Sequence, residues 1–261
     1  MQKFKKNNLI NTMILCAGRG KRMGYKTQYI AKPLIKIQNR PILSINLQYL
    51  AKLGIKNCII NNSYKYKTIQ KFIKDYSYKN AYPKIHSSFE TERLETGGGV
   101  KKTLHLFNKK SILIVNGDSL LLNKTNICPV SKLYNNFNSA VMNILLLIAP
   151  IKKSIGYEGR GDFIMESDKI VSRIKRNKGN SRSQSYVFTG WQIINKELFT
   201  QIKEKKFSLN LLYDLALNKK KLFAVKLDGY FLHASTPKSI IQIEQFINSK
   251  KKTLNEKNYI L

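Results

Sequence analysis

Acidic residues are scarce in this chain. Only 15 of its 261 residues are aspartate or glutamate, against 47 lysines and arginines, so the formal net charge is +32 at pH 7. Such an excess usually indicates a polyanionic partner, either nucleic acid or an anionic membrane. Arginine is scarce as well, with 8 residues, although surfaces that clamp phosphates or read bases favour its bidentate guanidinium. We therefore attribute most of the charge to compositional drift and solvated surface, and expect no specific nucleic-acid partner.

Cysteine, proline and long apolar segments are also few. The three cysteines, Cys16, Cys58 and Cys128, are widely spaced and offer neither a disulfide framework nor a Cys-x-x-Cys metal pattern. Six prolines and 14 glycines exclude collagen-like and Pro-rich repeats. The most apolar stretch, residues 140–150, is far shorter than the roughly 20 residues of a spanning helix, and the basic start has no apolar signal core. These absences predict a cytoplasmic protein without a membrane partner.

Strand-like and helix-like patterns, in contrast, alternate along the chain. Apolar runs predict strands at residues 13–15, 58–60, 111–115 and 140–148, and periodic segments predict helices at 42–53, 66–76 and 96–106. Further strands are expected at 162–165, 170–174, 186–194 and 222–227, and helices at 207–217 and 236–248. The order predicts an α/β fold with a mostly parallel mixed sheet flanked by helices. No linker or repeat stands out, so we expect a single domain over residues 1–261, with a core at about 12–248 and basic extensions at both ends.

Three polar clusters follow predicted strands, at residues 18–22, 95–99 and 116–118. Because open α/β sheets bind ligands at the carboxyl ends of their strands, these clusters should converge on one site. The glycines of the first cluster allow the backbone to approach a phosphate, and Arg22 and Lys32 add two cations nearby. The stretch matches neither the dinucleotide pattern nor a P-loop. Glycines and two cations together predict a site for a triphosphate.

The residues that carry these clusters resemble a known family. The stretch ILCAGRGKRM at 14–23, with Lys32-Pro33-Leu34, resembles the signature of the sugar-1-phosphate nucleotidylyltransferases. LETGGG at 94–99, VNGD at 115–118, GRGDF at 159–163 and FTG at 188–190 are similar to the family's later motifs. The combination resembles above all the small N-acetylmuramic acid 1-phosphate uridylyltransferases of cell-wall recycling in peptidoglycan metabolism, and mannose-1-phosphate guanylyltransferase-like proteins are similar.

The resemblance implies a Rossmann-like nucleotide-diphospho-sugar transferase fold and a reaction. The chain would transfer a nucleotidyl group from an NTP, with UTP favoured, to a sugar 1-phosphate, with N-acetylmuramic acid 1-phosphate favoured, and release pyrophosphate. Neutralisation of phosphate charge would dominate the chemistry, through Arg22, Lys32 and Asp118. The residues expected to bind the nucleotide are Ala17, Gly18, Gly20, Lys21, Arg22, Lys32 and Gly98. Those expected to bind the sugar are Asn116, Asp162, Thr189 and Gly190.

The expected metal site departs from the family's pattern. Asp118 would hold Mg²⁺, a hard cation that prefers carboxylate oxygen. The family's second metal-binding aspartate lies in an aromatic-x-Asp-x-Gly-Thr motif, but here GYFLHASTP at 229–237 puts His233 at that position. Imidazole suits Mn²⁺ and other softer divalent ions better than Mg²⁺. Three readings stay open: His233 binds a softer metal, Mg²⁺ is held without it, or the site binds ligands with little turnover.

The sequence therefore leaves alternatives to the favoured enzyme. One is mannose-1-phosphate guanylyltransferase-type activity. Another, motivated by His233, is a non-catalytic homologue that binds nucleotide sugars, and a third, motivated by charge alone, is a nucleic-acid binder. The expected partners are an NTP and a sugar 1-phosphate, in a monomer or small homo-oligomer.

Overall fold

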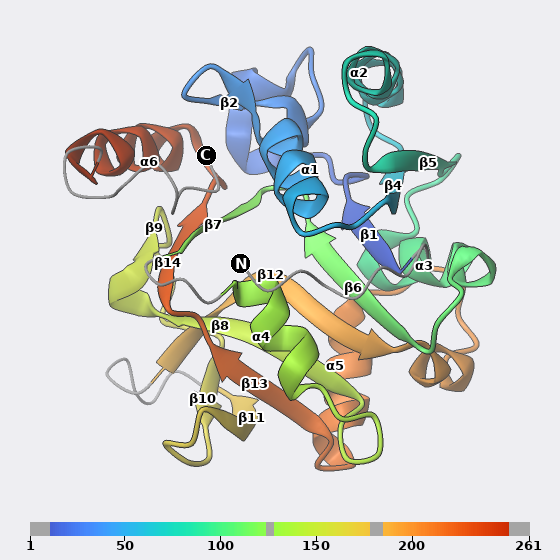
Figure 1. The fold of residues 1–261 in the computed structure, drawn as a ribbon, viewed down its shortest axis with the longest axis vertical. Coiled ribbons are helices and arrows are strands. Elements are labelled where there is room, and N and C mark those ends of the chain that lie inside the picture. Colours follow the sequence, from blue (N-terminus) through green and yellow to red (C-terminus); the bar gives the residue numbers. More distant parts are fainter. Residues whose placement is uncertain (1–10, 124–127, 178–184, 251–261) are drawn as a thin grey trace.

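The computed structural model describes residues 11–123, 128–177 and 185–250. Its centre is a nine-stranded sheet, with the strand order β10-β11-β13-β8-β12-β6-β1-β4-β5 (Figure 1). The strands are β1 (Thr12–Leu15), β4 (Asn57–Asn62), β5 (Lys84–Phe89), β6 (Ser111–Asn116), β8 (Ile144–Pro150), β10 (Phe163–Met165), β11 (Val171–Arg176), β12 (Ser185–Asn195) and β13 (Leu222–Lys226). The helices are α1 (Ile42–Lys52), α2 (Tyr66–Lys79), α3 (Glu95–Lys102), α4 (Pro129–Asn136), α5 (Leu209–Asn218) and α6 (Pro237–Lys250).

The sheet is mixed, as the sequence predicts. Strands β1, β4, β5 and β6 pair in parallel, and β8 pairs in parallel with β13. Between these two groups lies β12, which runs antiparallel to both β6 and β8. Since β1, β4 and β6 are neighbours that run in one direction, their carboxyl ends meet at one edge, which is where the polar clusters were expected to converge.

Alternation along the strands divides the core into two layers. In β8, Leu145 and Leu147 belong to one buried cluster, and Leu146 and Ile148 belong to the other. This is the period of two that places successive side chains on opposite faces of a sheet. Buried residues of α1, α2, α4 and α6 complete the first cluster, whereas those of α3 and α5 complete the second. The central strand β8 is apolar throughout because both faces of the sheet are covered.

A second, three-stranded sheet continues from the edge of the first. It contains β7 (Ser119–Asn123), β14 (Gly229–His233) and β9 (Ser154–Ile155), in the order β7-β14-β9. Strand β7 follows β6 after a two-residue turn, and α6 follows β14 beside it (Figure 1). A two-stranded hairpin of β2 (Lys36–Ile37) and β3 (Arg40–Pro41) precedes α1. The small sheet therefore brings the chain after β6 next to the chain at the end of β14.

Most expected elements are present, with shifted ends. The expected strand at 140–148 begins at Ile144, and the expected helix at 96–106 divides into α3 and a 3₁₀ turn, Leu104–Leu106. The sequence reading assigned no strand to β7 or β14 and no helix to α4.

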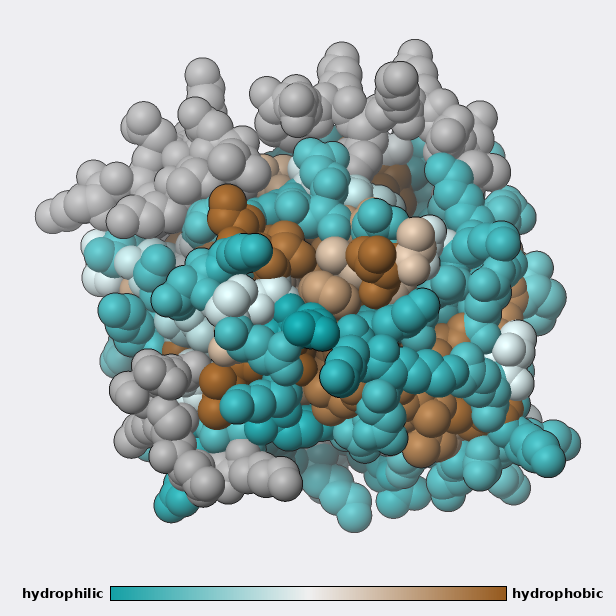
Figure 2. Space-filling model, turned by 90° about the horizontal axis from the view of Figure 1, so that it is seen from below, coloured by the Kyte–Doolittle hydropathy of each residue, from teal (hydrophilic) through white to brown (hydrophobic). Residues whose placement is uncertain are grey.

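None of the helices within the described ranges is long and apolar enough to cross a membrane. One face of the molecule carries mostly hydrophilic side chains with apolar ones scattered among them (Figure 2).

Candidate active site

A pocket of about 370 Å³ opens at the carboxyl ends of β1, β4 and β6. All three predicted polar clusters contribute to it, which confirms that they converge. Ser208, the residue just before α5, also lines the pocket, although it is distant in sequence from the three clusters. The residues that line the pocket are Leu15, Cys16, Ala17, Gly18, Lys32, Pro33, Asn61, Arg93, Glu95, Thr96, Asn116, Gly117, Asp118 and Ser208.

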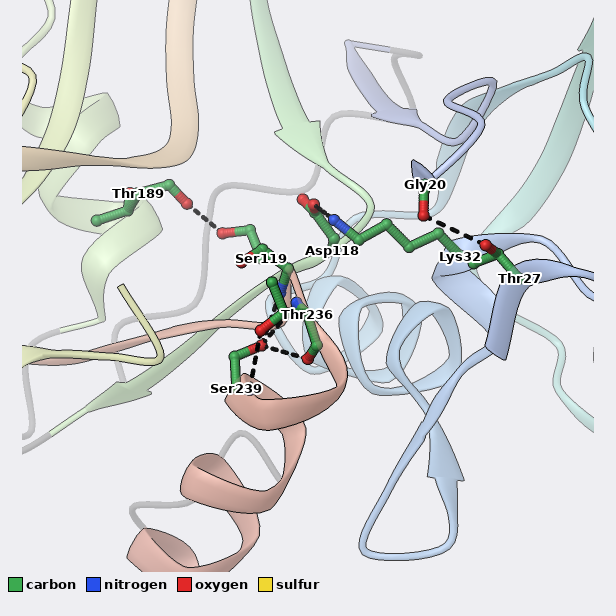
Figure 3. Close-up of polar contacts among 9 residues, drawn as sticks. Gly20, Thr27, Lys32, Asp118, Ser119, Thr189, Thr236 and Ser239 are labelled. Atoms are coloured by element: carbon green, nitrogen blue, oxygen red, sulfur yellow. Dashed lines mark hydrogen bonds and ion pairs between the residues drawn. The ribbon is translucent and has the colours of Figure 1, made fainter. Parts of the chain in front are cut away.

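Lys32 and Asp118 form an ion pair inside this pocket (Figure 3). Lys32 lies in a single 3₁₀ turn, Lys32–Leu34, whose second residue is Pro33. The side chains of Lys32 and Asp118 are only 11% and 24% exposed. Burial raises the pKa of Asp118, but the nearby Lys32 ammonium and His233 more than compensate, so the pKa lies below its usual value. The pocket thus contains a fixed cation and a carboxylate that stays ionised at neutral pH.

Gly20 belongs to the loop that passes over Lys32. Its φ is +64°, and a Cβ at this position would lie 2.9 Å from Cβ of Lys32. Its carbonyl accepts a hydrogen bond from Thr27 Oγ1 at 3.2 Å (Figure 3). A glycine is needed here for both conformation and space. Gly20 itself does not line the pocket, so its expected role in nucleotide binding stays a prediction.

Lys21 and Arg22 are exposed and lie outside the pocket wall. Lys21 lines a separate cavity of about 540 Å³, together with Arg19 and Tyr25. The charge of Arg22 reaches the main site, because it contributes to lowering the pKa of His233. An exposed loop with three cations beside the pocket is suited to meeting an anionic ligand, and the assignment of Arg22 to the triphosphate stays a prediction.

His233 lies beside Asp118, as the small sheet requires. It ends β14 and pairs in register with Ser119, the residue after Asp118. Burial lowers the pKa of His233, and Lys32 and Arg22 lower it further against the opposing effect of Asp118. Its Nδ1 is buried and has no hydrogen-bond partner in the described structure. A neutral imidazole whose ring nitrogen has no hydrogen-bond partner, next to a carboxylate, can serve as a ligand for a metal cation.

The chain beyond His233 is fixed by the start of α6. Thr236 and Ser239 exchange backbone-to-hydroxyl hydrogen bonds of 2.9 and 3.1 Å (Figure 3). Ser235, which stands where the family motif has glycine, donates its N–H to the Ser239 hydroxyl at 2.9 Å. This is the reciprocal pattern of a helix cap. The end of β14, and with it His233, is therefore held firmly.

The glycines of the second cluster serve the protein itself in this structure. The N–H groups of Gly97 and Gly98 both donate to the carbonyl of Phe207, at 2.9 and 3.0 Å. A Cβ on Gly97 would overlap the Phe207 ring, and a Cβ on Gly98 would overlap the carbonyl oxygen of Lys205. Gly98 lies outside the main pocket and lines another cavity. In this structure the absence of a side chain at Gly98 allows residues 205–207 to approach closely. The expected contact of Gly98 with a nucleobase stays a prediction.

The expected sugar-side residues are largely committed to other protein groups. Asp162 accepts from the backbone N–H of Phe188 at 2.8 Å and from the hydroxyl of Tyr157 at 3.2 Å. Burial is the main cause that raises its pKa above the usual value. Thr189 donates its hydroxyl to the carbonyl of Leu147 at 2.8 Å, and its own carbonyl accepts from Ser119 (Figure 3).

Asn116 and Gly190 complete this side of the site. Asn116 lines the pocket, whereas Gly190, Asp162 and Thr189 do not. Gly190 has a φ of +81°, and a Cβ there would lie 2.8 Å from Cβ of Asn116. Gly190 therefore gives Asn116 the space in which its side chain lies. The expected sugar contacts of all four residues stay predictions.

Sequence reasoning missed several residues of the pocket wall. Asn61 ends β4, accepts a hydrogen bond from Cys16 N at 2.8 Å and donates to Glu90 at 2.7 Å. The rule that polar residues at strand ends form the site would have identified Asn61. No such signal existed for Ser208, which reaches the pocket from more than 100 residues beyond the second cluster.

The family model described as nucleotidyl transferase matches residues 11–250 of this sequence.

The chain belongs to the nucleotidyl transferase family.

Relatives of this nucleotidyltransferase differ in their substrates. It is 28% identical over 232 residues to the D-glycero-alpha-D-manno-heptose 1-phosphate guanylyltransferase of Aneurinibacillus thermoaerophilus, covering 87% of this chain and 94% of the relative. It is 24% identical over 233 residues to the N-acetylmuramate alpha-1-phosphate uridylyltransferase of Caulobacter vibrioides, covering 89% and 94%. A crystal structure of UDP-glucose pyrophosphorylase with UDP-glucose superimposes with a TM-score of 0.74 at 12% identity, over 93% and 100% of the two chains. The fold is that of the nucleotide-diphospho-sugar transferases.

Proposed function

We propose that this nucleotidyltransferase transfers the uridylyl group of UTP to N-acetylmuramic acid 1-phosphate and releases pyrophosphate. The coarser part, sugar-1-phosphate nucleotidyltransferase activity, is supported by the family match and by the names of the relatives. The choice of UTP and of this sugar is supported by the LETGGG and GRGDF motifs and by the likeness to the Caulobacter enzyme. The single observation that carries the reaction is the Lys32–Asp118 pair inside a pocket at the strand ends.

The residues of the pocket fit an in-line displacement. An oxygen of the sugar 1-phosphate attacks the α-phosphorus of UTP, and the bond from that phosphorus to the oxygen bridging the β-phosphorus breaks. The protein has little covalent work to do, so positioning and charge neutralisation dominate. Lys32 would neutralise the α-phosphate, in competition with its present partner Asp118. Arg22 would meet the β- and γ-phosphates and then the leaving pyrophosphate.

A divalent cation is part of the proposal, with Mg²⁺ or the softer Mn²⁺ as candidates. The residues present fit such an ion, because Asp118 offers a carboxylate and His233 a buried Nδ1 without a partner. Among the described side chains no group of three or more His, Cys, Asp and Glu could hold a metal. Substrate phosphates and water would complete the ligands, which is how Mg²⁺ is usually held. When bound, the cation would neutralise the growing negative charge on the phosphates.

A guanylyltransferase is the second candidate, because the heptose 1-phosphate guanylyltransferase is also similar over most of its length. Pyrophosphate release distinguishes the two, measured for UTP, GTP, CTP and dTTP against N-acetylmuramic acid, mannose and heptose 1-phosphates, with Mg²⁺ and with Mn²⁺. We expect the highest kcat/KM for UTP with N-acetylmuramic acid 1-phosphate. A GTP preference would overturn the substrate assignment alone. Silence across the matrix would contradict the reaction, and binding without turnover would favour the non-catalytic homologue.

The cellular setting follows from this substrate pair. A cytoplasmic role in cell-wall recycling, as a monomer or small homo-oligomer, belongs to the proposal. Purified protein analysed by light scattering would test the oligomeric state.

A further inference from the structure

Glu95 has a backbone conformation that is uncommon for residues other than glycine, and for which asparagine and aspartate are the usual exceptions. Its φ is +62°, in the left-handed region. The other non-glycine residues with positive φ in the described ranges lie at the β2–β3 turn or next to helix ends: Gln38, Asn39, Lys65 and Lys220. Glu95 is also at a helix end, as the first residue of α3, but it differs from the others in that it lines the main pocket. For a residue with a Cβ this conformation costs stability, and it persists only where the surrounding structure imposes it.

The surroundings of Glu95 do impose it. On its N-terminal side, Leu94 N donates to the Glu90 carboxylate at 3.1 Å, and Leu94 O accepts from Phe207 N at 3.2 Å. On its C-terminal side, Thr96 Oγ1 accepts from Leu209 N at 2.9 Å. Hydrogen bonds therefore hold both neighbours of Glu95, and its strained φ is fixed from both sides.

The supports of Glu95 are themselves anchored. Glu90 is 1% exposed and is also bound by Asn61 of the pocket wall, at 2.7 Å. The segment before α5 is held by the Lys101 ammonium, which donates to the carbonyls of residues 202, 203 and 204 at 2.5, 3.3 and 3.2 Å. A glycine at position 95 would adopt this positive φ without strain. The backbone conformation alone therefore does not explain why a glutamate side chain is present.

The charge of Glu95 is also unexpected. Within residues 11–123, 128–177 and 185–250, its one ionic contact is with Arg93, at 3.4 Å between side chains that are 37% exposed for Glu95 and 47% exposed for Arg93. Such an exposed, long pair adds little stability. A carboxylate that such a pair neutralises only in part, in the wall of a pocket for two phosphate-bearing substrates, would repel them. A carboxylate is useful there if it accepts a hydrogen bond from an uncharged part of a ligand.

We propose that Glu95 is a specificity-determining residue whose carboxylate accepts a hydrogen bond from an N–H or O–H group of the nucleoside or of the sugar. The left-handed backbone, fixed by Glu90 and by the segment before α5, directs this side chain into the pocket wall. The inference rests on the proposed function, because it needs a nucleotide or sugar phosphate as the ligand. It extends that function by naming the residue that reads an uncharged part of the substrate.

The test compares stability with binding in three variants. Glu95→Gly removes both the strain and the carboxylate, Glu95→Gln keeps the strain and removes the charge, and Lys220→Gly is the matched control. Lys220 has a φ of +54° and is exposed beyond α5, away from the pocket. We expect both glycine variants to raise Tm by about 2–4 °C. Glu95→Gly and Glu95→Gln should weaken ligand binding about tenfold, as hydrogen bonds to charged groups do when lost, and Lys220→Gly should not.

Two measurements identify the source of the donor. Calorimetry with UTP or GTP alone reports a nucleoside group, and KM for the sugar phosphate at saturating NTP reports a sugar group. A loss in either, with kcat nearly unchanged, supports the inference. Unchanged affinity for both ligands in Glu95→Gly, whatever its Tm, overturns it. If the wild type binds nucleotide but turns over no substrate pair, the proposed function fails, and calorimetry with the nucleotide and with the sugar 1-phosphate decides on Glu95. A wild type that binds neither ligand overturns both.

Discussion

Polar groups near the two sides of the pocket are paired in different ways. At the ends of β1 and β6, the charged side chains of Lys32 and Asp118 pair with each other. On the sugar side, Asp162 and Thr189 form hydrogen bonds with backbone groups of Phe188 and Leu147. A substrate can displace one member of a side-chain ion pair by offering a stronger partner. To displace Asp162 or Thr189 from its backbone partner, a substrate would have to rotate the side chain and leave a partly or fully buried backbone group without its hydrogen bond.

This difference in pairing suggests two roles for residues that all lie in family-like motifs: Lys32 and Asp118 take part in the reaction, and Asp162 and Thr189 stabilise the fold around the pocket. We expect substitutions at the Lys32–Asp118 side to change catalysis with little change in stability. Substitutions at the sugar side should change stability first, and binding only through the residues they support. Four variants, ordered from the largest expected effect to the smallest, test this division.

Lys32→Gln should have the largest effect. It removes the ammonium from the α-phosphate but leaves an amide that can still donate to Asp118. Loss of one preorganised cation at a phosphoryl centre should lower kcat about 100- to 1000-fold. Lys36→Gln, at an exposed residue of β2, is the control and should keep full activity. Steady-state pyrophosphate release measures both. A Lys32→Gln enzyme within threefold of wild type would show that the ion pair is structural.

Gly190→Ala should mainly destabilise the fold. Gly190 and Gly54 have nearly the same φ, +81° and +80°, but a Cβ on Gly54 would meet nothing within 4 Å. Gly54→Ala therefore measures the backbone cost alone, about 1 kcal/mol. Gly190→Ala adds the overlap with Asn116 and should cost about 2–3 kcal/mol of unfolding free energy. Because Asn116 lines the pocket, KM for the sugar phosphate should also rise. Equal losses in urea unfolding of the two variants would contradict this account.

His233→Asp should change the preference between metals. A carboxylate suits Mg²⁺ better than an imidazole does. We expect the ratio of kcat/KM with Mg²⁺ to that with Mn²⁺ to rise about tenfold, in line with changes at groups that tune metal sites. His86→Asp, on the exposed strand β5, serves as the control. An unchanged ratio would remove His233 from the metal site.

Asp162→Asn should have the smallest effect, visible in the pH dependence of stability. Burial raises the pKa of Asp162 above its usual 3.8. As pH rises, Asp162 therefore loses its proton at a lower pH in the unfolded chain than in the folded protein. The wild type loses folding stability between the unfolded pKa, about 3.8, and the higher folded pKa. The unfolding free energy of the variant relative to wild type should increase across this window and stay constant above it. A difference that is flat from pH 3 upward would exclude a raised pKa.

The sequence predicted the elements whose pattern depends only on local chemistry. The apolar runs of β1, β4 and β6 and the periodic helix α1 are evident because burial on one or two faces fixes residue types. The same rule located the strand-end clusters that line the pocket. The two short strands β7 and β14 were missed, since each is stabilised by pairing with a segment more than 100 residues away.

Long-range contacts also limit what could be said of individual residues. Gly98 reads as a ligand-contacting glycine in a motif, but the carbonyl of Lys205 occupies the space beside it. The positive φ of Glu95 is held by hydrogen bonds of its neighbour Leu94 with Glu90 and Phe207, which no local propensity reports. Sequence patterns predicted that the three clusters converge on one pocket, and tertiary contacts determine which partner each residue has.

The Lys32–Asp118 pair has a consequence for a chain with a net charge of +32. A protein so basic gathers phosphate, chloride and metabolite anions over its whole surface. Asp118 is the counterion that Lys32 already has, and we expect it to keep Lys32 from holding any of these anions. A monovalent anion would pair with Lys32 but leave Asp118 without a partner. A polyphosphate that arrives with a divalent cation offers a phosphate to Lys32 and the cation to Asp118. Raising the salt concentration should therefore slow capture of substrates through the surface field, while the pair continues to select which anion enters the pocket.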